Sequence, residues 1–419
     1  MFKFIHAADI HIDSPFLGLE AYEGAPIEQL RSATRKAFEQ LVDLAIENEV
    51  AFVIIAGDLF DGRWQDMQTG LWTARQFRRL ESANIRLYLI RGNHDAASKV
   101  RSAITWPENV FEFSVRKPQT FQIKPLRVAL HGQGFAKQEC LDDLASQYPE
   151  AVSGWFNIGV LHTSLTGDVP HDTYAPTSLS VLQTRHYNYW ALGHIHQRSN
   201  PPICDGPYVA YSGNTQGRHV NETGPKGCLL VTVDDEIQDV EFLPTDILRW
   251  YRTEISLDEN DDITELLAKA RERLAECHGE SGGRFSAVRL EIHGACKAHQ
   301  RLVKRAEREE TLAEIRNIVN ELDEEIWIEK TRFETRPLAD LNVLRQGQDL
   351  LGSLLRDIDH IRNGDESLAT LAGELTGLES KASVELKAAG IDLSDPDQLR
   401  AWLSDAESML VSRLAEDLG

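Results

Sequence analysis

The feature that most constrains the fold is an apolar stretch, VAFVIIA, at residues 50–56. A short and uniformly apolar run is typical of a strand that is buried on both faces, as in a parallel sheet covered by helices. Weaker runs follow at residues 85–90, 156–161 and 189–192. Apolar residues recur at helical spacing over residues 27–45 and 71–80. Residues 1–245 are therefore predicted to form a layered α/β domain.

Short polar motifs follow the predicted strands. In chain order they are Asp9-Ile-His11, Gly57-Asp58-Leu-Phe-Asp61, Gly92-Asn93-His94-Asp95, His162 in VLHTS, and Gly193-His194-Ile-His196. Strand carboxyl ends meet at one edge of an open α/β sheet, so we expect these side chains to converge. Their oxygen and nitrogen donors suit Mn²⁺, Fe or Zn²⁺ better than Ca²⁺. The glycines before Asp58, Asn93 and His194 are expected to permit sharp turns.

Each motif alone has an ordinary structural explanation. A single Asp-x-His or Gly-Asp occurs by chance, and His162 alone would more often be a hydrogen-bonded core histidine than a metal ligand. Gly-Asn-His-Asp and Gly-His-x-His are more specific. The occurrence of all five in order, each after a strand, favours a metal site over coincidence.

This order of motifs resembles that of the calcineurin-like metallophosphoesterases. Within them it is similar to the SbcD-like branch, which includes a nuclease of double-strand-break repair, and most of all to YhaO-type proteins. The segments that carry this likeness are ADIHIDSPFLGL (8–19), HDTYAPTSL (171–179) and SGNTQGRHVNETGPKGC (212–228). The resemblance is strong over residues 1–245 and weaker beyond them. It implies an αββα sandwich with a small α+β capping domain and a helical C-terminal tail.

The resemblance also implies two divalent metal ions, with Mn²⁺ the expected metal. One ion would take Asp9, His11, Asp58 and His196, and the other would take Asp58, Asn93, His162 and His194. The shared Asp58 agrees with two-metal chemistry, in which a water between the ions becomes hydroxide and attacks phosphorus in line. The family places His94 outside the ligand set, where it stabilises charge or protonates the leaving oxygen. Asp95 is expected to fix the His94 tautomer.

Residues around the metal ligands are candidates for substrate binding. Asp61 stands where archaeal and eukaryotic members carry a His that positions substrate, whereas SbcD-type members often have Asp. Asp61 either orients a ligand or caps the following turn, and this departure leaves the choice between endo- and exonuclease action open. Arg63 either contacts phosphate or is solvated. Tyr174, Asn214 and His219 lie in the shared segments and are expected to line the substrate groove.

Residues 246–335 show a second pattern, with three predicted strands separated by helical stretches at about 262–277 and 298–322. This βαβαβ order predicts a small α+β module, which in the relatives caps the active site and helps to contact DNA. Five cations recur at helical spacing, namely Lys297, Arg301, Lys304, Arg305 and Arg308. The stripe, and within it Arg301 and Arg305, either binds DNA or forms a solvated face paired with acids such as Glu309 and Glu310.

The tail, residues 336–419, is predicted to be helical and to carry no catalytic cluster. Apolar residues at Leu351, Leu354, Leu355 and Ile358 have the spacing of a helix that docks in a groove. In the SbcD family, C-terminal helices dock on an ATPase partner. The alternative is that these residues close a bundle with the helices predicted at 365–388 and 397–418.

The composition sets limits on localisation and partners. A net charge of −22 argues against a protein that coats nucleic acid by bulk electrostatics. The five cysteines are scattered and form no CxxC, which favours free thiols in a reducing compartment. The start, MFKFIHAADIH, is too short for a signal peptide, and no apolar run approaches a membrane span. We expect a cytoplasmic protein without a membrane partner.

The leading prediction is a Mn-dependent DNA exonuclease that serves as the nuclease subunit of an SbcCD-like repair complex. An SbcC-like coiled-coil ATPase would supply the nucleotide site, because this sequence has no GxxxxGK[ST] loop. A homodimer is a further expected assembly. The alternatives are a phosphodiesterase or phosphatase acting on a small molecule or protein, and a non-catalytic subunit that binds DNA ends. The capping unit favours a large substrate, and the intact His94 favours catalysis.

Overall fold

The computed structural model describes residues 1–14, 25–61, 67–97, 105–165, 174–322, 325–338, 341–381 and 391–414. The chain divides into two compact units. Unit 1 comprises Met1–Arg252, Cys277–Val288 and Glu325–Glu329, and unit 2 comprises Thr253–Glu276, Arg289–Glu324 and Lys330–Gly419. Residues 246–335 thus contribute to both units. The division into three domains at 245 and 335 stays a prediction.

The first sheet of unit 1 has the order β12-β11-β1-β2-β3-β4. Its parallel part consists of β1 (Phe2–Ala7), β2 (Phe52–Ala56), β3 (Arg86–Ile90) and β4 (Val110–Glu112). An antiparallel hairpin, β11 (Gly227–Asp234) and β12 (Glu236–Pro244), extends it beside β1. Every residue of β2 is buried, as the apolar stretch predicts.

The second sheet has the order β5-β6-β7-β8-β10-β9. Its members are β5 (Gln119–Ile123), β6 (Val128–Gly132), β7 (Phe156–His162), β8 (Tyr189–Gly193), β9 (Cys204–Asp205) and β10 (Tyr208–Tyr211). Strands β6, β7, β8 and β10 run parallel, with β5 and β9 antiparallel at the edges. The carboxyl ends of β7 and β8 thus lie at the same edge of this sheet.

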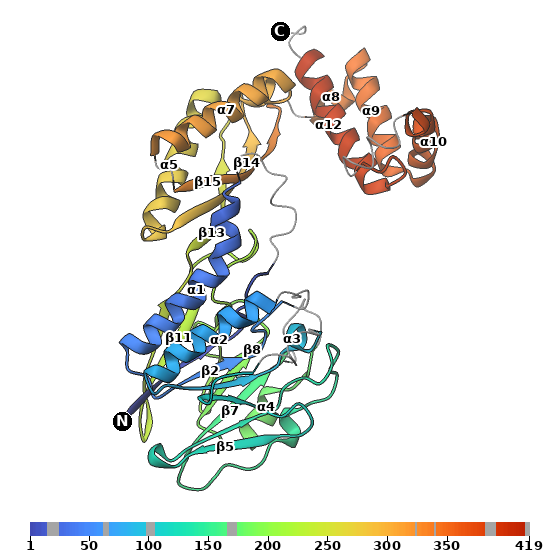
Figure 1. Cartoon of the computed structure of the whole chain (residues 1–419). Coiled ribbons are helices and arrows are strands. Elements are labelled where there is room, and N and C mark those ends of the chain that lie inside the picture. The colour runs from blue at the N-terminus through green and yellow to red at the C-terminus, as the bar shows by residue number, and fades with distance from the viewer. Residues whose placement is uncertain are drawn as a thin grey trace. The chain divides into compact units, whose positions relative to one another are not determined.

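Strand β2 shows how the layers form, because its side chains alternate between two cores. Val53 and Ile55 join a core with residues of α1 (Ile27–Glu47) and α2 (Met67–Ser82). Phe52 and Ile54 join another core with residues of β7 in the second sheet. Helix α4 (Leu179–Thr184) contributes to a third core on the far face of that sheet. Figure 1 shows α1 and α2 on one side of the two sheets and α4 on the other. The predicted αββα sandwich is confirmed.

A third sheet has the order β13-β14-β15, from β13 (Leu248–Ser256), β14 (Phe285–Ala295) and β15 (Ile326–Arg336). Helix α5 (Ile263–Ser281) connects the first two strands. Between β14 and β15 the structure has α6 (His299–Leu302) and α7 (Arg305–Leu322). The βαβαβ order agrees with expectation, but the single helix expected at 298–322 is interrupted at residues 303–304. The positive stripe therefore does not lie on one continuous helix.

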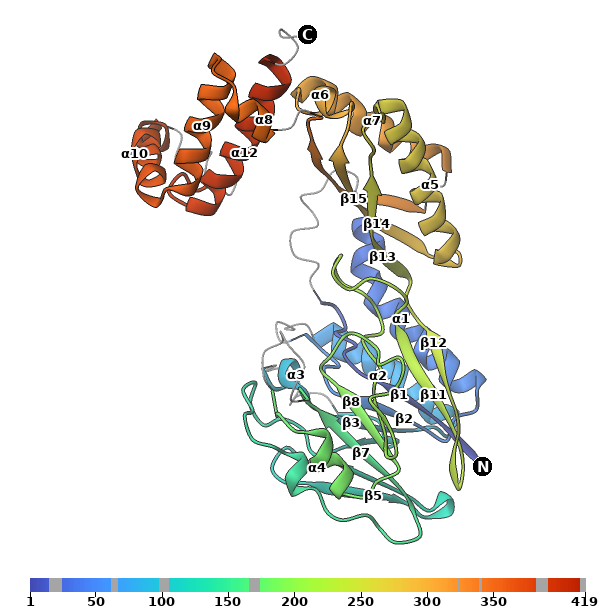
Figure 2. The ribbon, with the colours of Figure 1, turned by 180° about the vertical axis from the view of Figure 1, so that it is seen from behind.

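The tail contains α8 (Leu341–Gln346), α9 (Leu350–Asn363), α10 (Asp365–Lys381) and α12 (Pro396–Leu414), and Figure 2 shows these four helices grouped together. Asp349 separates α8 from α9, because its carboxylate caps α9 by accepting from the Gly352 amide at 2.7 Å. Leu351 and Leu355 pack against Val411 of α12. For these two residues the structure supports the bundle alternative rather than docking anchors. No helix among the described residues is both long and apolar enough to cross a membrane.

Candidate metal centre

Four of the seven predicted ligands have unusual backbone conformations at the carboxyl ends of the central strands. Asp9, His11, Asp58 and His194 all have positive φ, at 51°, 46°, 51° and 102°. Such conformations cost a residue with a side chain on the order of 1–3 kcal/mol and persist only where the surroundings enforce them. Strain gathered at one edge of two sheets is typical of a functional site.

The first ligand group joins the loops after β1 and β8. Ligand atoms of Asp9, His11 and His196 all lie within 4.8 Å of one another. The Nε2 atoms of His11 and His196 are 3.3 Å apart, and His196 Nε2 is 4.0 Å from Asp9 Oδ1. Two imidazole nitrogens that face each other beside a carboxylate form a donor set suited to a divalent cation.

The second group joins the loops after β2, β3 and β7. His162 Nδ1 lies 2.9 Å from the carbonyl oxygen of Ala56, and this contact places the ring proton on Nδ1. His162 Nε2 then faces Asn93 Oδ1 at 2.9 Å and Asp58 Oδ2 at 3.3 Å. Asp58 Oδ2 is also 3.8 Å from His11 Nε2. Asp58 thus lies between the two groups, the position that a bridging carboxylate needs.

The charges at this point also favour a cation. Burial opposes ionisation of Asp58, but the neighbouring His162 lowers the pKa of Asp58 to about 2. Burial likewise opposes protonation of His162, but Asp58 and Asp9 raise the pKa of His162 to about 9. A positive charge between these groups is therefore favourable, and a metal ion supplies one as a proton does. The residues present fit two divalent metal ions.

His94 is partly exposed, with 36% of its side chain accessible. A ligand atom of its ring lies within 4.8 Å of ligand atoms of His11 and Asp58. Its backbone amide donates to Asp58 Oδ1 at 2.9 Å, at the start of the short helix α3 (Asn93–Ala97). Its Nδ1 lies 3.6 Å from Asp61 Oδ1. Burial lowers the pKa of His94, but Asp61 and Asp58 raise it above its ordinary value. These carboxylates thus favour the protonated form of the His94 ring beside the ligand groups.

Comparison with known proteins agrees with this geometry. Residues 2–198 match the calcineurin-like phosphoesterase family, and residues 250–336 match the middle domain of metallophosphoesterase YhaO. The chain is 31% identical over 379 residues to the uncharacterized metallophosphoesterase YhaO of Bacillus subtilis, covering 90% of each chain. The chain belongs to the YhaO-type family of calcineurin-like metallophosphoesterases. It is therefore a phosphoesterase, and its fold implies divalent metal ions at the ligand groups above.

More distant relatives are named as DNA repair proteins. The chain is 24% identical over 281 residues to the DNA double-strand break repair protein Mre11 of Sulfolobus acidocaldarius, which covers 64% of this chain and 70% of the relative. It is 24% identical over 277 residues to the protein of the same name from Sulfurisphaera tokodaii, covering 63% and 68%. Over about two thirds of its length, the chain is thus similar to proteins named for DNA double-strand break repair.

Asp95 holds the backbone around the metal centre of this metallophosphoesterase. The expected role of Asp95 in fixing the His94 tautomer stays a prediction. The Asp95 side chain is buried and accepts hydrogen bonds from the backbone amides of Leu59 at 3.2 Å, Phe60 at 3.0 Å and Gly92 at 3.2 Å. It ties the loop after β2 to the loop after β3. Asp61 Oδ1 lies 3.6 Å from His94 Nδ1, which favours a role in orienting a side chain of the site, and the turn that Asp61 would cap lies outside the described residues.

The glycines of the motifs matter mainly because neighbouring loops lie too close to leave room for a side chain. A Cβ atom on Gly92 would lie 2.2 Å from Asp58 Oδ1, and one on Gly193 would lie 2.0 Å from the Ala56 carbonyl oxygen. Gly57 has a φ of +97° and would place a Cβ 2.3 Å from His162 Nδ1. Only Gly57 of these three needs a left-handed turn. The other two let ligand loops of neighbouring strands touch.

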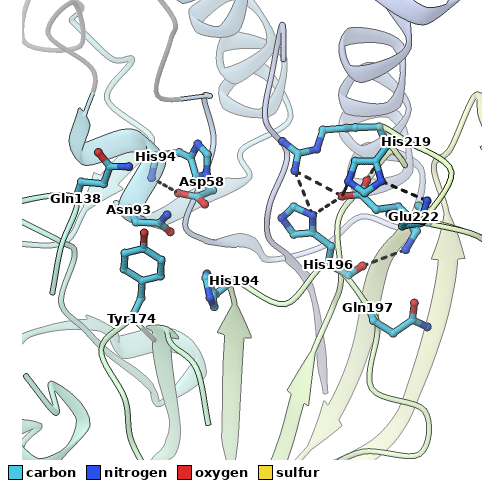
Figure 3. Close-up of a pocket in the computed structure, with 13 residues that line it drawn as sticks. Asp58, Asn93, His94, Gln138, Tyr174, His194, His196, Gln197, His219 and Glu222 are labelled. Atoms are coloured by element: carbon cyan, nitrogen blue, oxygen red, sulfur yellow. Dashed lines mark hydrogen bonds and ion pairs between the residues drawn. The ribbon is translucent and has the colours of Figure 1, made fainter. Parts of the chain in front are cut away.

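Four of the predicted ligands, Asp58, Asn93, His194 and His196, line a cleft with a volume of about 810 Å³. Figure 3 shows Tyr174, Gln138, Asn93 and His94 on one side of the cleft, His196, His219 and Glu222 on the other, and His194 between them. Tyr174 lines it as predicted, with its ring centroid 5.3 Å from that of His194. His194 also donates its backbone amide to both oxygens of Asp9, at 3.1 and 3.0 Å.

The segment 212–228 supplies cleft residues that sequence reasoning missed. Glu222, Arg218 and Lys226 all line the cleft, and Glu222 is buried against His196. The resemblance drew attention to this segment, but an isolated Glu has no motif spacing that marks it. Of the two residues predicted there, His219 lines the cleft. Asn214 does not, because it is fully buried and its amide donates to Gln216 O and Glu222 Oε2, both at 2.9 Å.

The remaining predicted residues lie elsewhere. Arg301 and Arg305 belong to unit 2 and are exposed. Arg301 Nε donates to Glu307 at 2.6 Å, and Arg305 Nε donates to Glu309 at 2.9 Å. This is the arrangement of a solvated, ion-paired face. Arg63 lies outside the described residues.

Proposed function

We propose that this metallophosphoesterase is a Mn-dependent DNA nuclease. The observation that carries the proposal is the position of Asp58 between two ligand groups, with the partly exposed His94 beside them at the mouth of a wide cleft. Relatives named as DNA double-strand break repair proteins, similar over about two thirds of this chain, support nucleic acid as the substrate.

Bound metal ions would supply an activated water and counter the negative charge of a phosphodiester. His94 lies where a proton donor to the leaving oxygen is needed. Its Nδ1 faces Asp61, which favours the charged ring, and Nε2 is then the nitrogen from which a proton can pass. Asp61 orients the ring and Asp95 fixes the loops that carry it.

The cleft offers contacts for a nucleotide. Arg218 and Lys226 bring positive charge to the cleft of a chain whose net charge is −22, and guanidinium groups match phosphate oxygens well. On the opposite side, the Tyr174 ring offers a face for stacking of a base, a contact common in proteins that bind single strands. Two cations on one side of the cleft and an aromatic ring on the other favour a phosphodiester of nucleic acid over a bare phosphate monoester.

A second candidate is a phosphodiesterase that acts on a small molecule. The observation that favours it is the pairing of Arg301 and Arg305 with glutamates, because paired cations offer less to a long DNA backbone. The same metal groups, His94 and cleft would serve this reaction.

An SbcC-like coiled-coil ATPase and a homodimer remain proposed partners. Because Leu351, Leu355 and Ile358 are buried, a docking surface on the tail must use other residues. Val343 and Leu350 expose 64% and 71% of their surface. If the tail docks on such an ATPase, Val343→Asp with Leu350→Asp should abolish co-purification while hydrolysis of a small diester persists. Unchanged co-purification would contradict this docking surface.

The proposed function is tested by incubating the full chain with Mn²⁺ and separate substrates. These are single-stranded DNA, duplex DNA, a DNA hairpin, a cyclic nucleotide and bis-p-nitrophenyl phosphate. We expect cleavage of DNA and of bis-p-nitrophenyl phosphate, and EDTA should abolish both. Cleavage of the cyclic nucleotide without cleavage of any DNA would replace the nuclease by the small-molecule enzyme.

A further inference from the structure

His196, a predicted metal ligand, is held on both its ring and its backbone by the segment 212–228. Glu222 Oε1 lies 2.6 Å from His196 Nδ1. The Lys226 ammonium donates to the His196 carbonyl oxygen at 3.1 Å, and the Asn214 backbone amide lies 3.3 Å from the same oxygen. Gly213, with φ +74°, has no room for a Cβ, which would be 2.9 Å from that oxygen. One segment thus fixes the position of one ligand.

Glu222 is itself fixed by several partners. The residue is only 7% exposed. Its Oε2 accepts from the Asn214 side-chain amide at 2.9 Å and from the Arg218 backbone amide at 2.7 Å. Its Oε1 lies beside His196. Both oxygens have defined donors, so the carboxylate has one orientation.

The segment is also anchored to the neighbouring strand β13. The Gln216 side chain donates to the Leu248 carbonyl oxygen at 2.6 Å, and the Trp250 indole donates to the Gly217 carbonyl oxygen at 3.0 Å. Gln216 and Trp250 are completely or almost completely buried. These contacts lie within unit 1. The fold therefore holds the segment 212–228, and Glu222 with it, in one position.

The contact with Glu222 sets the chemistry of the His196 ring. Two groups approach His196 Nδ1, the Glu222 carboxylate at 2.6 Å and Arg218 Nη2 at 3.3 Å. A neutral imidazole carries one proton, and the nearer carboxylate keeps that proton on Nδ1. The lone pair of Nε2 then points toward Asp9 and His11, which are 4.0 and 3.3 Å away. The Ala56 carbonyl oxygen sets the tautomer of His162 in the same way.

Glu222 also lies next to the cation that borders the cleft. The Arg218 Nη2 atom is 3.5 Å from Glu222 Oε1, and Nη1 is 3.7 Å from Asp61 Oδ2. Nη1 also lies 3.4 Å from the Ser14 hydroxyl. With 17% of its side chain accessible, Arg218 lines the cleft without extending freely into solvent. A planar guanidinium held in this way suits two oxygens of a phosphate group.

We propose that Glu222 is a positioning residue that couples the metal centre to the phosphate-binding side of the cleft. One carboxylate oxygen aligns His196 for the metal ion shared with Asp9 and His11, and the carboxylate as a whole holds Arg218 for a phosphate oxygen. The role of Arg218 rests on the proposed function, whereas the role of Glu222 toward His196 requires only a metal ion.

The test is a calorimetric titration of the full chain with Mn²⁺, for the wild type and for Glu222→Gln. Gln keeps the size of the side chain but removes its charge. We expect the affinity of one of two Mn²⁺ sites to fall by about 10–100-fold, as is common when the partner of a ligand His is changed. The site with Asp58, Asn93, His162 and His194 should be unaffected. Glu241→Gln, on the exposed side of β12, is the matched control and should bind as the wild type does.

Arg218→Gln separates the two halves of the inference. Because Glu222 still pairs with His196 Nδ1, this variant should change the Mn²⁺ affinities less than Glu222→Gln does, although Arg218 Nη2 also lies 3.3 Å from His196 Nδ1. It should raise the KM for bis-p-nitrophenyl phosphate by about tenfold or more, because a charged hydrogen bond to phosphate is lost. Glu222→Gln should change both the affinity and the KM. A wild-type KM in Arg218→Gln would overturn the assigned role of Arg218.

Equal Mn²⁺ affinities in the wild type and Glu222→Gln would overturn the positioning role of Glu222. If Glu222→Gln does not fold, the ¹⁵N spectrum of histidine-labelled wild type decides, with His196→Gln used to assign the signal. We expect His196 to carry its proton on Nδ1 in the metal-free chain, and a proton on Nε2 would overturn the inference. A wild type that binds Mn²⁺ but cleaves no DNA would refute the proposed nuclease function without affecting this result.

Discussion

The metal centre of unit 1 and the positive stripe of unit 2 carry charged residues in opposite ways. In the centre, Asp58 and His162 are buried and meet across short distances. In the stripe, Arg301 and Arg305 are exposed and pair with glutamates of the same region. A charge that the fold has buried and oriented determines chemistry, whereas an exposed pair is easily replaced by water and salt. Substitutions should therefore have large effects in the first region and small ones in the second.

The largest effect should come from Asp58, which lies between the two ligand groups and is the proposed bridge. Asp58→Ala would remove that bridge, and hydrolysis of bis-p-nitrophenyl phosphate in Mn²⁺ should fall to the rate in buffer alone. Steady-state rates of the purified variant measure this, with circular dichroism as the control for folding. A variant that folds and retains a tenth of the wild-type rate would show that the metals do not depend on Asp58.

His94→Ala should have a smaller effect on rate and little effect on metal binding. The ring lies beside the ligand groups and is paired with Asp61, so its removal should cost about 10²–10³ in kcat. Asp61→Asn should lower kcat less, because the ring remains. Measurement of kcat alongside bound Mn²⁺ separates the two effects. Wild-type turnover in His94→Ala would remove His94 from the mechanism.

Gly92 tests the close contact between the loops. A Cβ at this position would lie 2.2 Å from Asp58 Oδ1, so Gly92→Ala should destabilise the fold by roughly 1–3 kcal/mol through overpacking. Gly279, in helix α5, has nothing within 4 Å of a Cβ, and Gly279→Ala should be neutral or should stabilise the chain slightly. Urea unfolding of both variants makes the comparison. Equal stabilities would contradict the close approach.

The smallest effect is expected in the stripe. Arg301→Glu with Arg305→Glu should leave hydrolysis of bis-p-nitrophenyl phosphate unchanged, since both residues belong to unit 2 and are exposed. If the ion-paired face is correct, duplex affinity should also be unchanged at two salt concentrations. Weaker duplex binding with a flatter salt dependence would instead show that the stripe contacts DNA.

The convergence of the predicted ligand residues could be foreseen from sequence, because each follows a strand and the order of motifs is specific. Glu222 could not, since it lies 26 residues from His196 and the fold alone brings them together. The second sheet was only partly foreseen, because β5 (QTFQI) contains interspersed polar residues and β10 has only four residues. The break before α9 was missed, although Asp349 is a good capping residue.

The tail and the positive stripe show what sequence spacing alone does not decide. In the tail, the spacing of Leu351 and Leu355 fits both a docking face and a bundle, and only their contact with Val411 distinguishes them. In the stripe, the positions of Lys304 and Arg305 suggested one helical face, but the helix is interrupted between α6 and α7. Periodicity identifies an apolar or charged face without saying what covers it.

The central claim is that Asp58 joins two metal sites. Equilibrium dialysis of the full chain against Mn²⁺, followed by metal analysis, tests it most directly when the wild type and Asp58→Ala are measured together. We predict two Mn²⁺ ions per wild-type chain and loss of both from a folded Asp58→Ala. One ion in the wild type, or one ion retained with unchanged affinity in the variant, would contradict a shared carboxylate.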